Sequence, residues 1–484
     1  MKRISLFIIV LILYAGCNSP LDIEPEEALT FKNFKTQKGM TSLILKAEEE
    51  TLHAIHRNST RLEIGAIPPE GNNIRRLPSN PSLDDIGKAI STCNAVLKLL
   101  PNVEEVTEEW RNLQKGEMLY FKSLIYLIIA QTYGDYVLIK EEPYVGAIAK
   151  SSWVEIVDYA IECGEEAAML LPHKREDKNW NYPLTYDNFF YGDKGMANAV
   201  LAHLYAWKAG CKWMAPPEFA NYDEKECWKK CAEKCTDIIK SGFYELEKDA
   251  MSMKKCFLTQ ESSKENILVL PYIDFPYFGS TYVVFFRAQE WMAYPPANYI
   301  SLAKKFNKAW VEDFYAGGDN RKYAFFDYKT SEQYIEPDRL LMHKFYTRGV
   351  GGSFTKYRLG GIYLLRAEAR ERTGDRKGAV EDMNTIRKRV NASLYDPGEY
   401  GGDLRLAIFK EREKELWYEG HRLYDLMRHG IPYIREGIKA LDMHSLSDQD
   451  FLDGCLFSVI PRYLFEKNTL LRQNKYWFKH LPRH

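Results

Sequence analysis

The sequence predicts a mostly α-helical protein, in which a frame of repeated helix pairs carries an irregular, loop-rich region with a few short strands. Segments of helical periodicity, closed by Gly, Pro or capping residues, run through about 83–241 and 357–430. Residues 243–356 are instead rich in Gly, Pro and aromatic residues. A chain of 484 residues with 45% hydrophobic and 27% charged residues can bury a large core.

The N-terminus predicts a secretory signal that ends at a lipidated cysteine. Lys2 and Arg3, an apolar run over 4–14 and the small pair Ala15-Gly16 precede Cys17. The run is shorter than the ~20 residues of a spanning helix. We expect 1–16 to be removed, Cys17 to carry acyl chains, and the acidic stretch 17–35 to tether a single domain over 36–484. Tyr14 departs from the usual pattern, so an ordinary signal peptide with a chance cysteine is the alternative.

Composition argues against several classes of function. The formal net charge is −1 and no basic block stands out, so nucleic acid is not an expected partner. The nine cysteines are irregularly spaced, although a disulfide involving Cys211 stays open. Cys227, Cys231 and Cys235 recur every four residues, but on a helix the outer two lie ~12 Å apart, too far for one zinc ion. We expect these thiols to pack a helix, and we expect no metal and no cofactor.

The helices of the frame have recognisable ends. In the first half their expected ranges are 83–100, 110–132, 151–171, 193–209 and 223–241. Ser152 and Glu155 have the spacing of a capping box at the start of the third. The segment 124–130 is apolar all round, which indicates burial between helices rather than a membrane span.

Short strands are expected in the middle, and helices return after it. Residues 266–273 and 340–347 predict strands, and 362–372, 376–390 and 404–419 predict helices. Ala367 and Ala379 lie twelve residues apart across the turn Gly374-Asp375. Small residues at this separation match, in part, the tetratricopeptide pattern, in which two helices pack closely. The frame is therefore expected to be an interrupted helical repeat.

Several motifs together resemble the SusD-like (RagB/SusD) family. Within 363–430 the chain reads YLLRAEARERTGDRKGAVEDMNTIRKRVNA and then EREKELWYEGHRLYDLMRHG, similar to the C-terminal signature of that family. Other matching pieces follow the family's order: Cys93-Asn94, GEMLYFKSLIYLIIAQTYGD, IIKSGFYEL, ENILVLPY and IPRYLFEKNTLLRQNKYW. The last contains Pro461, Glu466, Asn468, Gln473 and Asn474.

The resemblance implies a fold with four tetratricopeptide-like units and an irregular part that carries much of the ligand site. It also implies a cell-surface lipoprotein of Gram-negative bacteria, held in the outer membrane by its N-terminal lipid. Such proteins are not enzymes. They capture oligosaccharides and deliver them to a SusC-like TonB-dependent transporter, the implied partner.

Candidate ligand-binding residues are aromatic and polar, because a sugar ring stacks on an aromatic face and its hydroxyls need hydrogen-bond partners. The densest supply is 274–310, within an irregular region of about 243–356, and core packing is the alternative for each ring. The best candidates there are Trp291, Tyr294, Tyr277 and Asp274. The loop 57–81 adds Arg61, Asn72, Asn73 and Arg75. A third patch, Trp180, Tyr182 and Tyr186, is more typical of scaffold.

Two other functions stay open at this point. No Trp lies between Cys17 and Trp110, where family members often place one, so a peptide ligand is an alternative. A surface glycoside hydrolase is less favoured. Its candidate carboxylates, Glu411, Glu415 and Glu419, are spaced one helical turn apart, but they would face the same side rather than flank a bond. We expect them to form a partly buried charge network that joins the last helices, with Arg412, Arg422 and Arg428 nearby.

Overall fold

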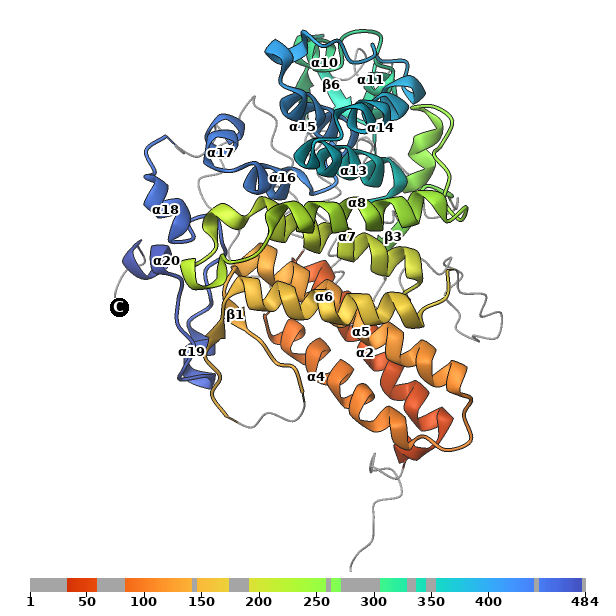
Figure 1. Cartoon of the computed structure of the whole chain (residues 1–484), viewed down its shortest axis with the longest axis vertical. Helices are drawn as coiled ribbons and strands as arrows, with labels where there is room; N and C mark the ends of the chain where they lie inside the picture. Colours follow the sequence, from red (N-terminus) through yellow and green to blue (C-terminus); the bar gives the residue numbers. More distant parts are fainter. Residues whose placement is uncertain are drawn as a thin grey trace, which may run out of the picture.

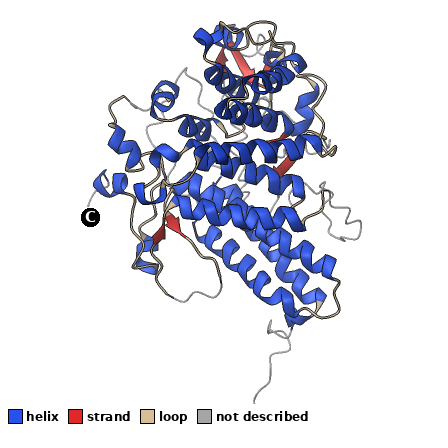
Figure 2. Cartoon of the chain, in the orientation of Figure 1, coloured by secondary structure: helices blue, strands red, loops and turns tan. Residues whose placement is uncertain are grey.

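The computed structural model describes residues 33–58, 83–141, 146–173, 191–257, 263–270, 305–328, 337–344, 354–438 and 444–480. In these ranges helices dominate and the strands are short (Figure 2). The first two helices, α2 (Gln37–Asn58) and α4 (Leu83–Leu99), lie at one end of the molecule. The small elements α10 (Lys308–Phe314), α11 (Arg321–Phe325) and β6 (Arg339–Met342) lie at the opposite end (Figure 1).

Within the described ranges, four helix pairs pack one after another in chain order. They are α2 (Gln37–Asn58) with α4 (Leu83–Leu99), α5 (Glu108–Tyr133) with α6 (Trp153–Leu170), α7 (Lys194–Gly210) with α8 (Glu224–Lys240), and α13 (Leu359–Thr373) with α14 (Arg376–Arg389). Neighbouring pairs also touch, since α4 contacts α5, α6 contacts α7 and α8 contacts α13 (Figure 1). The expected helical-repeat frame is therefore confirmed, and α2 is a further member of it, outside the predicted helix ranges.

The chain leaves this frame after α8 and returns at α13. Between them lie β3 (Asn266–Leu270), β4 (Lys305–Asn307), α10, α11, β5 (Phe326–Asp327), β6 and β7 (Phe354–Arg358). β3 pairs antiparallel with β7, and β6 lies between β4 and β5 in an antiparallel sheet. The strands expected at 266–273 and 340–347 correspond to β3 and β6, and their last three residues each lie outside the described residues.

Helix ends follow the capping residues. Ser152 and Glu155 form the predicted capping box of α6, with the Ser152 N–H donating to Glu155 Oε2 over 2.9 Å. Asp193 caps α7 by accepting from the Met196 N–H at 2.7 Å. α6 begins at Trp153, two residues after the predicted start at Ser151. Ser151 belongs to β2 (Lys150–Ser151), which pairs with β1 (Tyr136–Val137).

The core of the frame uses the apolar and small residues that the sequence singled out. Residues 124–130 of α5 are all buried, as expected for a helix enclosed by others. Ala367 and Ala379 are fully buried where α13 meets α14, and the helix turn between them closes on Gly374 at φ 98°. Cys231 and Cys235 are buried on α8, so the helix-packing prediction is confirmed for these two thiols, whereas Cys227 is half-buried. Cys211 is a buried free thiol.

The C-terminal part wraps back along the frame. It contains α15 (Leu404–Glu415), α16 (Arg422–His429), α17 (Ile431–Gly437), α18 (Asp448–Leu452), α19 (Tyr463–Lys467) and α20 (Lys475–His480). α15 packs on α13, and α16 packs on α7 (Figure 1). Short 3-10 turns complete the described chain: Asn33–Lys35, Leu100–Asn102, Lys212–Met214, Pro217–Phe219, Ser252–Phe257 and Glu399–Gly402. Among the residues described, no helix combines the length and the apolar character of a membrane span.

Candidate functional site

The predicted ligand-binding residues and the lipidation residue lie outside the described part of the chain. Cys17 falls in 1–32, and the third patch falls in 174–190. Arg61, Asn72, Asn73 and Arg75 fall in 59–82, and Asp274, Tyr277, Trp291 and Tyr294 fall in 271–304. Their roles stay predictions. The described residues reveal the scaffold from which the segment 271–304 departs and to which it returns.

That segment connects two anchored strands. β3 is buried along its whole length and pairs with β7, so the chain enters 271–304 from a fixed strand. The chain returns through β4, where Phe306 is buried. A segment that a rigid frame holds at both ends is a common place for a binding site.

A cluster of aromatic side chains packs around β4, where the chain returns from the segment 271–304. Its centre is Trp417, whose ring lies 5.2–5.6 Å between centroids from those of Phe306, Trp310, Phe314, Phe326 and Tyr418. Most of these contacts are edge-to-face, a favoured arrangement of aromatic pairs. Trp310, in the aromatic-rich stretch that the sequence indicated, is therefore a scaffold residue that packs against this core.

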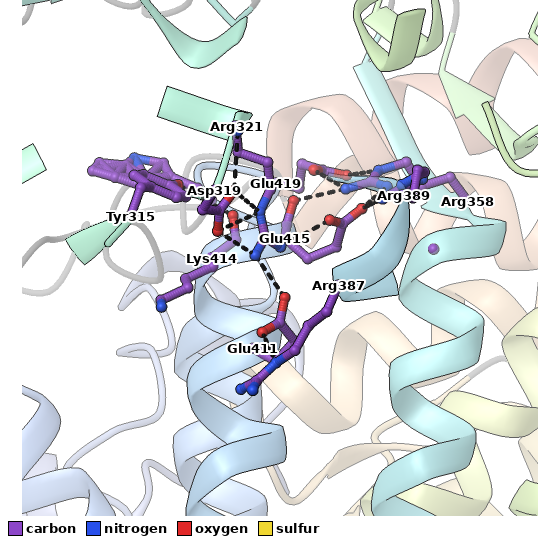
Figure 3. A network of polar contacts seen from close by, with 12 residues as sticks. Tyr315, Asp319, Arg321, Arg358, Arg387, Arg389, Glu411, Lys414, Glu415 and Glu419 are labelled. Carbon is purple, nitrogen blue, oxygen red and sulfur yellow. Dashed lines mark hydrogen bonds and ion pairs between the residues drawn. The ribbon is translucent and has the colours of Figure 1, made fainter. Parts of the chain in front are cut away.

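A buried network of charges ties the irregular region to the frame (Figure 3). Glu415, fully buried at the end of α15, lies between Arg321 on one side and Arg358 and Arg389 on the other. It accepts hydrogen bonds from Arg358 at 2.5 Å, from Arg321 at 3.0 Å and from Arg389. Burial alone would raise the pKa of Glu415, but Arg389, Arg358 and Arg321 outweigh it and hold that pKa well below its ordinary value.

The network continues to both sides of Glu415. Arg358 also donates to Glu265 at 2.6 Å and to Glu419 at 2.8 Å. Arg321 donates to Glu411 at 2.6 Å, and Arg387 donates to Glu411 at 2.8 Å. We define the buried network as Glu265, Asp319, Arg321, Lys344, Arg358, Arg387, Arg389, Glu411, Glu415 and Glu419.

These contacts confirm a charge network and correct two details of the prediction. α15 ends at Glu415 rather than at Glu419, because the chain turns so that Trp417 and Tyr418 enter the aromatic cluster, with Tyr418 at φ 61°. The arginines that neutralise Glu411 and Glu415 also come from β7, α11 and α14 rather than from the adjacent sequence. The expected arginines serve elsewhere: Arg412 pairs with Asp425, Arg428 with Glu368, and Arg422 with Glu413.

The carboxylates of this network are not placed for hydrolysis. Glu411, Glu415 and Glu419 are at most 2% exposed, so a glycosidic bond cannot reach them. A general acid must also hold a proton near neutral pH, whereas three guanidinium groups keep Glu415 ionised. The arrangement is instead suited to rigidity. It joins Glu265, the residue before β3, to Arg358, the last residue of β7, and these two strands pair beside the predicted ligand segment.

The last family motif, IPRYLFEKNTLLRQNKYW, contains amide side chains that hydrogen-bond to the backbone. The Asn468 side chain pairs with the backbone of Ile148, accepting from its N–H at 3.0 Å and donating to its carbonyl at 2.8 Å. Gln473 does the same to Ile460, at 3.2 and 3.0 Å. Asn474 accepts from the Trp477 N–H at 3.0 Å, at the start of α20. Each amide therefore satisfies backbone groups that the surrounding chain leaves without partners.

Comparison with known proteins gives the same architecture. A SusD homolog from Bacteroides thetaiotaomicron matches with a TM-score of 0.70 at 19% identity, over 91% of this chain and 98% of its own. A SusD-like carbohydrate binding protein from Bacteroides vulgatus matches with a TM-score of 0.60 at 20% identity, over 80% of this chain and 83% of its own. Four stacked helix pairs with an irregular region between the third and the fourth thus define a SusD-like fold.

The sequence comparisons find similarity to the same group of proteins. Residues 287–477 match the SusD family. A SusD-like protein of Formosa agariphila is 22% identical over 88% of this chain and 91% of its own length. These two matches support a SusD-like family member.

Proposed function

We propose that this protein is a non-catalytic, lipid-anchored protein of the outer membrane, which captures oligosaccharides at the cell surface and delivers them to a SusC-like TonB-dependent transporter. The observation that carries the proposal is the ordered set of family motifs, together with a family match over 287–477. The N-terminal signal and Cys17 support the anchored location.

The ligand contacts proposed for this function lie in two segments. Trp291, Tyr294 and Tyr277 would stack on sugar rings, and Asp274 would bond to hydroxyls. From the earlier loop, Arg61, Asn72, Asn73 and Arg75 would contribute further polar contacts. We expect micromolar to millimolar affinity, because a few stacked rings with solvated surroundings give a binding free energy of about −4 to −8 kcal/mol.

The test is a binding screen of the full chain in mild detergent. The panel contains oligosaccharides of starch, xylan, inulin, pectin and host O-glycans, with tryptic peptides of casein as the second arm. Each mixture is then analysed for products. The proposal is supported if one saccharide class binds and stays intact, and if Trp291→Ala weakens that binding whereas replacement of the partly buried scaffold residue Trp310 with Phe does not. Release of reducing ends by the pure protein contradicts it.

A peptide ligand is the second candidate function. It is favoured by one observation, the absence of Trp between Cys17 and Trp110, because that stretch then offers charged and amide side chains rather than an indole face. Binding of casein peptides without binding of any saccharide would replace the first proposal by this one.

The anchor and the partner need separate tests. Cys17→Ser should move the protein from the outer-membrane fraction to a soluble one, and metabolic labelling with an alkyne fatty acid should label only the wild type. Pull-down of the wild-type protein from solubilised outer membranes should recover a TonB-dependent transporter. Recovery of none after mild crosslinking would contradict the transporter part of the proposal.

A further inference from the structure

An exposed tyrosine lies on α11, beside polar side chains that hydrogen bonds hold in place. Tyr323, on α11, is 51% exposed. Within 305–328 and 337–344 it is the only large hydrophobic side chain that is exposed. An isolated exposed ring does not form the extended apolar surface that a protein partner needs, but it is large enough for one sugar unit.

The ring has a second tyrosine beside it. The centroids of Tyr323 and Tyr328 lie 5.2 Å apart, with the ring planes tilted by 53°. The Tyr328 hydroxyl donates to Glu312 Oε1 over 2.7 Å. α10, which carries Glu312, is itself capped by Asn307, whose side chain accepts from the Trp310 N–H at 3.1 Å. The second ring is therefore held by a hydrogen bond to a capped helix.

Charged groups surround the two rings. Lys322 donates to Glu312 Oε2, and its ammonium lies 5.2 Å from the centroid of the Tyr323 ring. The ammonium of Lys308 lies 5.9 Å from the centroid of the Tyr328 ring. The Glu312 side chain keeps 39% exposure, so its carboxylate can accept from a ligand hydroxyl while both of its protein contacts persist.

We propose that Tyr323, Tyr328, Glu312 and Lys322 form a further saccharide-binding platform, outside the predicted ligand segment 271–304, which contacts one neutral sugar unit of a longer chain. This inference rests on the proposed carbohydrate-binding function. The exposed Tyr323 face supplies stacking, and the carboxylate and ammonium supply an acceptor and a donor for hydroxyls. Because these contacts already order the groups, little side-chain freedom is lost on binding.

The experiment is affinity gel electrophoresis of the full chain in mild detergent, in gels that contain soluble starch, xylan, inulin or galactan. Tyr323→Ala should weaken retardation by the polysaccharide that binds the wild type, with an apparent Kd about 5- to 10-fold higher, the effect of one lost aromatic stacking contact. Tyr323→Phe keeps the ring and should stay within about twofold of the wild type. Phe243→Ala, which removes an exposed ring from another part of the surface, is the matched control and should change nothing.

The outcomes separate this inference from the proposed function. Retardation of Tyr323→Ala equal to that of the wild type overturns the platform alone. Equal losses in Tyr323→Ala and Phe243→Ala also overturn it, because the effect would not be specific to this ring. If no polysaccharide in the panel retards the wild type, the proposed function fails and the platform fails with it.

Discussion

Replacing Glu415 by Gln should destabilise the protein strongly, because the side chain is fully buried and neutralises three guanidinium groups. Gln keeps the shape but loses the charge, which leaves buried positive charge without compensation. Removal of one partner from a buried ion pair costs about 3–5 kcal/mol. The entropy of unfolding is about 2.1 cal/mol/K per residue, or roughly 1 kcal/mol/K for this chain, so the melting temperature should fall by about 3–5 °C.

The assay is thermal unfolding followed by circular dichroism, with Glu381→Gln as the matched control. Glu381 is exposed on α14, and its loss should change the free energy of unfolding by less than about 0.5 kcal/mol. Since the Glu415 pKa is lowered in the folded state, its stabilisation is complete above about pH 4.3 and is lost as the pH falls toward the lower folded value. A melting temperature unchanged from the wild type, with altered saccharide binding, would refute a structural role.

Three further predictions concern the frame. Gly210→Ala should lower the free energy of unfolding, measured in urea, by about 1–3 kcal/mol, because a Cβ there would lie 2.6 Å from Arg428 Cβ. Gly87→Ala is the control, and it should stabilise slightly because its added Cβ would meet open space. Equal effects of the two substitutions would contradict the close approach of α7 and α16. Burial lowers the pKa of His421 to about 3, so the unfolded chain binds a proton at a higher pH than the folded protein does. The free energy of unfolding should therefore decline as the pH falls from about 6.5 toward 3. His421→Phe should show a shallower decline in melting temperature over that range. Ser152→Ala should cost about 1 kcal/mol by removing the cap of α6, and a variant as stable as wild type would show that the cap contributes nothing.

Local signals in the sequence were sufficient for most of the frame. The capping box of α6, the Asp caps of α7 and α8, and the small residues between α13 and α14 each act within a few residues or across one turn. They therefore remain visible without a structure. The first helix, α2, lies outside the predicted helix ranges, because its mixed composition offers few signals: no acidic residue lies in its first turn.

The candidate site was less accessible to sequence reasoning. Aromatic density indicated the segment 271–304, whose residues the structure does not describe, so that prediction stays open. Density could not separate core rings from exposed ones, because exposure depends on what packs against each ring. Trp310 joins the aromatic cluster, while Tyr323, which lies outside the densest aromatic stretch 274–310, remains half-exposed beside Tyr328.

The sequence by itself predicted the helical frame, the resemblance to the SusD-like family and the ionic character of the Glu-rich segment. Only the tertiary structure decided which charges meet. Glu415 pairs with Arg321, Arg358 and Arg389, which lie 94, 57 and 26 residues away, and not with Arg412 in the neighbouring turn. Helical periodicity and caps arise from local backbone geometry, whereas ion pairs buried between elements arise only when distant segments pack and remove both charges from water.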